Sequence, residues 1–73
     1  MKFRKIEHTD DISRGNVYGF DNVEFKEFNY DNEGSALAIV DGTIHIFGLQ
    51  DLNDFLYLCA DWTPDNQCYE LDK

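Results

Sequence analysis

The dipeptide Asp41-Gly42 is the feature that most constrains the fold of this chain, because it lies between two apolar, β-branched segments. Asp-Gly suits a two-residue turn in which both residues have positive φ, and it is the strongest short-range signal for a β-hairpin. The two strands of this hairpin are predicted over 35–40 and 43–47. Residues 35–40 form a nearly continuous apolar run, which is typical of a strand inside a sheet.

Gly48 ends the second strand, and a helix is predicted directly after it, with Leu49 as the first residue of its apolar face. Apolar residues recur there three and four positions apart, which is the spacing of one helical face. The turn-forming segment 63–66 ends the helix. We expect the apolar face to pack on a sheet face that contains Ile44 and Ile46, with His45 pointing away from them. The members of the helical face are Leu49, Leu52, Phe55, Leu56, Cys59 and Trp62.

The segments before the hairpin predict further strands. Residues 2–7 favour a short edge strand, since sheet edges tolerate the lysine and arginine side chains found there. Residues 8–16 are rich in turn formers and indicate a loop or a single helical turn. Residues 22–30 alternate like a strand, but the apolar phase switches around Lys26-Glu27, which indicates a bulge or a strand covered on both faces.

Taken together, these segments and a last short strand over 68–71 predict one small α+β domain covering 1–73. The predicted architecture is an antiparallel sheet of three to four strands with one helix packed on one face. A chain of this size is marginal in stability, and its aromatic residues compensate because each one buries a large area.

The charge of the chain restricts its partners. The 73 residues carry fifteen acidic and six basic side chains, for a net charge of −9, and 42% of them are hydrophobic, too many for a disordered acidic tail. Residues 21–72 contain twelve acids and the single base Lys26, a net −11. Direct nucleic-acid binding is excluded, because it needs a cationic surface. No membrane span and no secretory signal are expected, so the protein is expected to be cytoplasmic.

Motifs for chemistry are missing from the sequence. There is no phosphate loop, dinucleotide fingerprint, H-E-x-x-H or C-x-x-C, so no enzyme activity and no cofactor are expected. The turn at 29–34 resembles a calcium loop, but Val40 occupies the position that needs a bidentate glutamate. Cys59 and Cys68 are expected to be reduced, although a disulfide between them is geometrically possible. Together with His8 and His45 they match no zinc spacing, so no metal is expected.

The acidic surface is therefore the remaining functional signal. Turns and the first turn of the helix favour acids and explain several of them without any partner. They do not explain the shortage of lysine, because unbalanced charge destabilises a fold through self-repulsion. We expect a basic groove to be bound by carboxylates on the helix and on the first hairpin, which is the strand 22–30 with the turn that follows it. Two tyrosines are candidate interface residues. The candidate partner-binding residues are Glu24, Glu27, Tyr30, Asp31, Glu33, Asp51, Asp54, Tyr57 and Asp61.

In size, single-domain build and dispersed acidity, the chain resembles the small phage-encoded inhibitors of bacterial defence, namely anti-CRISPR, anti-restriction and other nucleic-acid-mimic proteins. The resemblance implies a non-enzymatic inhibitor that binds the nucleic-acid groove of a defence complex in the host cytoplasm by DNA or RNA mimicry. Two alternatives stay open: an immunity-type or accessory protein that caps a basic partner, and a small oligomeric module that uses the edge strand near 3–6. The oligomeric state is left open, and the basic N-terminus (Lys2, Arg4, Lys5) is compatible with a mixed interface.

Overall fold

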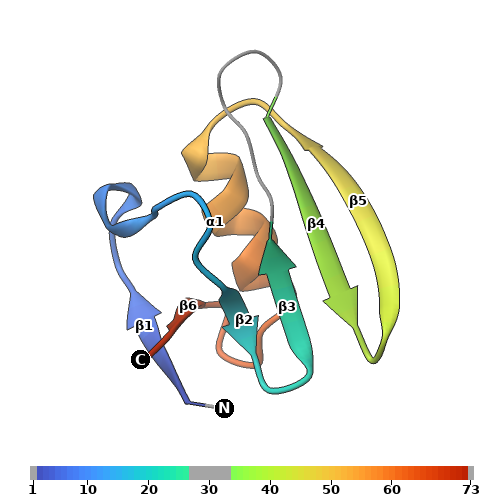
Figure 1. The fold of residues 1–73 in the computed structure, drawn as a ribbon. Helices are drawn as coiled ribbons and strands as arrows, with labels where there is room; N and C mark the ends of the chain where they lie inside the picture. The colour runs from blue at the N-terminus through green and yellow to red at the C-terminus, as the bar shows by residue number, and fades with distance from the viewer. Residues whose placement is uncertain (1, 27–33, 73) are drawn as a thin grey trace.

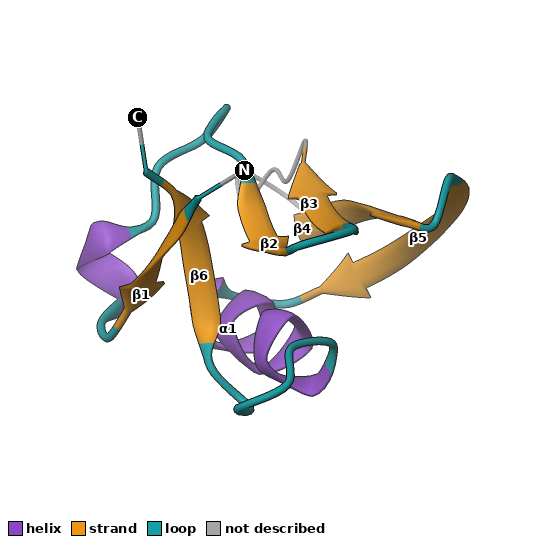
Figure 2. Cartoon of the chain, turned by 90° about the horizontal axis from the view of Figure 1, so that it is seen from below, coloured by secondary structure: helices purple, strands orange, loops and turns teal. Residues whose placement is uncertain are grey.

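The computed structural model describes residues 2–26 and 34–72, and within them it shows one antiparallel sheet with one α-helix (Figure 1). The described strands number six, in the order β1-β6-β2-β3-β4-β5. The sheet is bent, and α1 lies on its concave side (Figure 2). The elements are β1 (Phe3–Ile6), the 3-10 helix η1 (Thr9–Asp11), β2 (Tyr18–Phe20), β3 (Val23–Lys26), β4 (Gly34–Val40), β5 (Thr43–Leu49), α1 (Leu52–Asp61) and β6 (Cys68–Leu71).

The predicted α+β class is confirmed, but the predicted number of three to four strands is wrong. The strand that was not predicted is β2, which lies between β6 and β3 and pairs with both of them. It is only three residues long and has Gly19 at its centre, a composition typical of a loop. A Cβ atom on Gly19 would lie 1.9 Å from the Val23 carbonyl oxygen, and the φ of Gly19 is 134°. Only glycine therefore permits this close approach of β2 to β3.

The predicted hairpin at Asp41-Gly42 is confirmed as β4 and β5. Both turn residues have positive φ, 51° and 83°, as a two-residue turn of this kind requires. The Asn22 side chain donates a hydrogen bond to the Asp41 carboxylate, and the Asp41 N–H donates to the Asn22 carbonyl at 3.2 Å. These bonds join the turn of β4–β5 to the turn of β2–β3.

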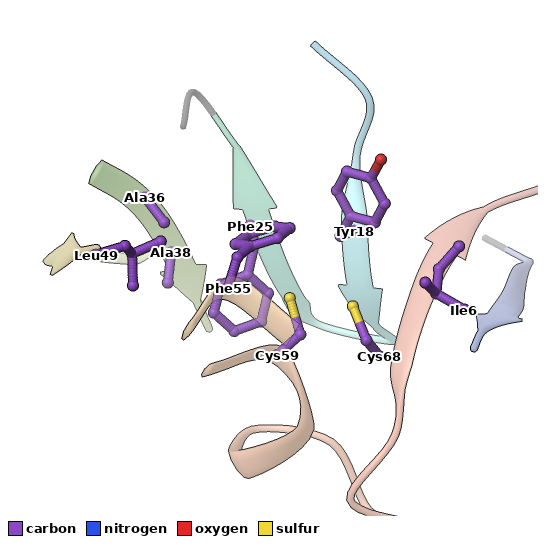
Figure 3. Close-up of a cluster of buried hydrophobic side chains, with 9 residues drawn as sticks. All are labelled: Ile6, Tyr18, Phe25, Ala36, Ala38, Leu49, Phe55, Cys59 and Cys68. Carbon is purple, nitrogen blue, oxygen red and sulfur yellow. The ribbon is translucent and has the colours of Figure 1, made fainter. Parts of the chain in front are cut away.

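The core forms where α1 crosses the middle of the sheet (Figure 3). Phe55 is fully buried, and its ring meets Tyr18 and Phe25 edge to face at centroid distances of 5.3 and 6.3 Å. The small residues Ala36 and Ala38 of β4 lie on the same side of the sheet and leave room for these rings. Of the predicted helical core residues, Phe55 and Cys59 are fully buried, and Leu52 and Leu56 pack against them while partly exposed.

The prediction that Ile44 and Ile46 face the helix is wrong. The β4–β5 register pairs His45 with Ala38, on the helix side, and it pairs Ile46 with Leu37 on the outer side. Ile44 and Ile46 are accordingly 61% and 76% exposed. The prediction failed because β5 continues through Leu49. Leu49 is buried, and His45 and Phe47 on the same face of the strand are half-buried, so this face of β5 is directed to the helix.

The ends of α1 are set by local hydrogen bonds. Leu49, which was expected to begin the helical face, belongs to β5, and the helix begins after the N-cap residue Asp51. At the other end, segment 63–66 ends the helix as predicted. The buried Thr63 hydroxyl accepts a hydrogen bond from the Gln67 N–H at 3.1 Å and donates to the carbonyl of the same residue, which closes this turn.

β1 is an edge strand, as predicted, and among the described strands it pairs only with β6. Arg4 of β1 forms an ion pair with Glu70 of β6, whose side chain is only 8% exposed. Asn16 donates a hydrogen bond to the other carboxylate oxygen of Glu70. A buried carboxylate needs such partners, so Arg4 of the basic N-terminus has a structural role within the sheet.

Candidate functional site

Two of the predicted partner-binding acids, Asp51 and Asp54, hold the start of α1. The Asp51 carboxylate accepts a hydrogen bond from the Asp54 N–H at 2.9 Å. The Asp54 carboxylate in turn accepts one from the Gln50 N–H at 2.8 Å. The first bond satisfies a backbone donor that the first turn of a helix leaves free, and the second ties Gln50, the residue before the N-cap, to the helix. Acids at this end also suit the helix dipole. Folding therefore accounts for the presence of these two acids, and Asp54 is partly buried rather than fully solvent-exposed.

Asp61 is different, because its charge lies at the end of the helix where the dipole disfavours it. It is the last residue of α1, it is exposed, and α1 has no basic residue in its last turn. A negative charge at the C-terminal end of a helix opposes the helix dipole. The ion pairs of the described part of the chain, Arg4–Glu70, Lys5–Glu7 and Lys26–Glu24, do not include Asp61. Local stability therefore does not account for Asp61, in contrast to Asp51 and Asp54.

A shallow groove between α1 and the end of β5 brings three of the predicted residues together. Its volume is about 250 Å³. The walls contributed by α1 carry Asp54, Tyr57 and Asp61, and the floor is apolar. Tyr57 is 72% exposed, so its ring and hydroxyl are available for contact. The full lining is Phe47, Gly48, Leu49, Asp54, Tyr57, Leu58 and Asp61. We refer to this feature as the acidic groove.

A second groove lies on the other side of α1, where the helix faces β1 and β6. Its volume is about 260 Å³, and Tyr57 borders it as well as the acidic groove. Most of its polar lining comes from amide side chains, Asn53, Asn66 and Gln67, and Glu7 is the only charged residue in that lining. The two grooves therefore differ in charge, and the negative field of α1 is concentrated on the side next to β5.

Of the other predicted residues that the structure describes, Asp51 and Glu24 do not line the acidic groove. Glu24 lies on β3, where it pairs with Ile39 across the strands and forms an ion pair with Lys26 at 3.1 Å. This register places Glu24 on the face of the sheet opposite α1, so the first hairpin and the helix do not form one acidic surface through this residue. Glu27, Tyr30, Asp31 and Glu33 lie outside the described residues.

An aliphatic patch on the outer face of β4 and β5 was not predicted from the sequence. Ile44 and Ile46 of β5 lie directly across from Ile39 and Leu37 of β4. The two β5 residues are the most exposed aliphatic side chains of the patch. A signal for this patch was present in the sequence, because the segment 34–49 contains a single charged residue, Asp41, in an otherwise highly acidic chain.

Metal-ligating side chains do not gather at any one place in the described residues. No group of three or more histidine, cysteine, aspartate or glutamate side chains within them could hold a metal ion. Both cysteines are buried and free, and burial raises the pKa of the Cys59 thiol, which keeps it protonated and unreactive. None of the described helices is long and apolar enough to cross a membrane.

The chain was compared with known proteins at three levels. No protein-family model matches it, and neither a curated protein nor a solved structure shows significant similarity to it.

Proposed function

We propose that this chain is a non-enzymatic binding protein whose acidic groove binds the basic, nucleic-acid-binding surface of a partner protein. The observation that carries the proposal is the position of Asp61. It adds negative charge to the groove at a site where the helix dipole disfavours it, so its presence is better explained by a partner than by folding. Its neighbours Asp54 and Tyr57 supply a second carboxylate and an exposed aromatic ring.

The charge of the surrounding chain supports a cationic partner. Residues 27–72 contain no lysine or arginine, so α1 and the strands beside it offer no internal counter-charge. Asp54 and Asp61 are seven residues apart, which is about 10 Å along a helix axis. Fixed carboxylates at such intervals attract a surface built to bind regularly spaced phosphates, and they accelerate its association.

The resemblance to phage-encoded inhibitors suggests the class of target, which is the nucleic-acid groove of a bacterial defence complex. An inhibitor of this kind competes with DNA or RNA for the groove. An immunity-type protein that caps a basic partner elsewhere does not compete. Competition therefore separates the proposed function from its closest alternative.

The experiment uses the immobilised chain to capture a partner from a bacterial lysate, followed by identification and purification of that partner. DNA and RNA of increasing length are then titrated into the complex. We expect nucleic acid to displace the chain. Retention of the complex at saturating nucleic acid would contradict the proposal.

A matched pair of variants tests the role of the groove in the same complex. Asp54→Asn with Asp61→Asn removes two charges from the groove, and asparagine still accepts the Gln50 hydrogen bond that Asp54 accepts. Asp21→Asn with Asp72→Asn removes two charges from exposed residues outside the groove lining. Only the first variant is expected to bind the partner less tightly, and equal losses would assign the effect to net charge alone.

A further inference from the structure

The outer edge of β5 is open for an additional strand. Among the described strands, β5 is the last of the sheet and pairs with β4 alone, so no described strand lies along its outer edge (Figures 1 and 2). It is seven residues long and carries no charged side chain. Natural proteins usually protect such an edge with lysine, proline or a bulge, because unpaired N–H and C=O groups attract another strand.

The backbone groups that point outward belong to alternate residues. The two-residue turn makes Val40–Thr43 the hydrogen-bonded pair that closes the hairpin, and hydrogen-bonded pairs alternate along an antiparallel ladder. Thr43 and every second residue after it therefore bond to β4. Ile44, Ile46 and Gly48 direct their N–H and C=O groups away from the sheet, toward an incoming strand.

The two faces beside this edge have opposite chemical character. On the outer face, Ile44 and Ile46 continue the aliphatic patch across to β4. On the helix face, the acidic groove with Asp54 and Asp61 borders the end of β5. A strand added at the edge would place successive side chains alternately on these two faces.

We propose that β5 accepts an extended segment of the partner as a seventh, antiparallel strand in which aliphatic and basic residues alternate. The aliphatic side chains cover Ile44 and Ile46, and the lysine or arginine side chains enter the acidic groove. This proposal rests on the proposed function, since the same carboxylates bind the partner, and it adds the conformation and residue pattern of the segment that they recognise.

A second copy of this chain fits the edge less well than a basic segment. Two copies bring together net charges of −9, and strand β5 of the second copy has no lysine or arginine to offer to the groove. Pairing about a two-fold axis at this edge also places the carboxylate-lined side of one α1 beside that of the other. Like charges so placed repel, whereas lysine and arginine are attracted.

The first test uses an eight-residue peptide of alternating valine and lysine and measures amide hydrogen exchange of the protein by NMR. We expect the N–H groups of Ile44, Ile46 and Gly48 to exchange at least about tenfold more slowly with the peptide bound, because each gains a hydrogen-bond partner. Binding without protection at these three residues would overturn the proposal.

Two N-methylated versions of this peptide serve as matched controls. In an antiparallel pairing, the valine N–H groups point to β5 and the lysine N–H groups point away from it. Methylation of the backbone nitrogens of the valines should abolish binding. Methylation of the backbone nitrogens of the lysines should preserve it. Equal binding of both methylated peptides would show that charge alone attracts the peptide. This result would overturn the proposal that the segment is added as a strand.

The second test uses variants of the protein and separates this proposal from the proposed function. Ile46→Pro removes an outward N–H and leaves the ladder to β4 intact, and Ile46→Thr keeps the N–H. We expect Ile46→Pro to weaken binding of the captured partner about tenfold or more and Ile46→Thr to weaken it much less. Circular dichroism and a melting curve confirm that both variants are folded.

The variants distinguish three outcomes. If Ile46→Pro binds normally while Asp54→Asn with Asp61→Asn binds poorly, the added strand is wrong and the proposed function stands. If both variants bind normally, both proposals are wrong. If sedimentation shows a dimer of the wild type that Ile46→Pro abolishes, the occupant of the edge is a second copy, which overturns the basic segment.

Discussion

The two edges of the sheet are built in different ways. β1 is four residues long, and its two central residues, Arg4 and Lys5, are both charged and exposed. β5 is seven residues long and has no charged residue, and its outward side chains include two exposed isoleucines. The first edge has the features that prevent strand addition, and the second lacks all of them.

This difference indicates which of the two edges is suited to accept another strand. A protein with fifteen acidic side chains could place one on β5 without disturbing the core, because Ile44 and Ile46 are on the solvent side. It places none there, while the groove next to β5 carries two carboxylates. An uncharged edge beside a charged groove is the combination expected of a binding surface, and the β1 edge has no such combination.

The largest expected effect comes from a change in the core, which supports the strands leading to both edges of the sheet. Phe55 is fully buried and contacts Tyr18 of β2 and Phe25 of β3, so it supports both halves of the sheet. Phe55→Ala should lower the free energy of unfolding by about 3–5 kcal/mol, enough to unfold a marginal domain. Urea denaturation measures this loss, and a folded variant with an unchanged midpoint would show that the core lies elsewhere.

A change at the β1 edge should affect stability and not binding. Arg4→Met removes the ion pair with the buried Glu70 carboxylate and leaves Asn16 as its remaining described partner. The loss should be about 1–3 kcal/mol, the usual result of leaving a buried acceptor without its donor. Thermal unfolding measures the stability, and binding of the partner at a temperature where the variant is folded is the control. A stability equal to that of the wild type would mean that Glu70 needs no cation.

Much of the fold was predictable because strong local patterns agreed with the final structure. The hairpin at Asp41-Gly42, the edge strand β1 and the apolar face of α1 depend on turn preference and periodicity within short segments. β2 was not predictable, because its three residues form a strand only through their pairing with β3 and β6. The facing of β5 was also not predictable, since alternating apolar residues occupy both of its faces.

The candidate site was predictable only in part. Asp54, Tyr57 and Asp61 were all predicted to bind the partner, and the structure brings these three together. The separation of Glu24 from them depends on strand register, which the sequence does not reveal. The open edge of β5 depends on the strand order, a global property that no local pattern encodes.

A smaller effect, of opposite sign, is expected for the acid at the end of α1. Asp61→Asn removes a charge that opposes the helix dipole, so it should raise the free energy of unfolding by about 0.3–1 kcal/mol at low ionic strength. Asp51→Asn is the control at the other end of the helix, where the charge suits the dipole and its removal should lower stability slightly. Chemical denaturation at low salt measures both changes. A loss of stability in Asp61→Asn would assign this residue a structural role.

The smallest effect is expected at the open edge. Ile46 is 76% exposed on the outer face of β5, so Ile46→Thr should change the free energy of unfolding by less than about 0.5 kcal/mol. Threonine retains the β-branched shape that suits a strand. A denaturation curve beside that of Arg4→Met compares the two edges directly. A loss as large as that of Arg4→Met would mean that the patch is part of the core.

The most direct measurement of the central claim is the rate at which the chain associates with its isolated partner at two ionic strengths. The account predicts that the wild type associates faster at low salt, because screening is weaker there. It also predicts that Asp54→Asn with Asp61→Asn associates more slowly, with the larger deficit at low salt, while Asp21→Asn with Asp72→Asn stays close to the wild type. If the groove variant and the wild type associate at equal rates that do not depend on salt, the acidic groove is only a solvated surface and the proposed function is wrong.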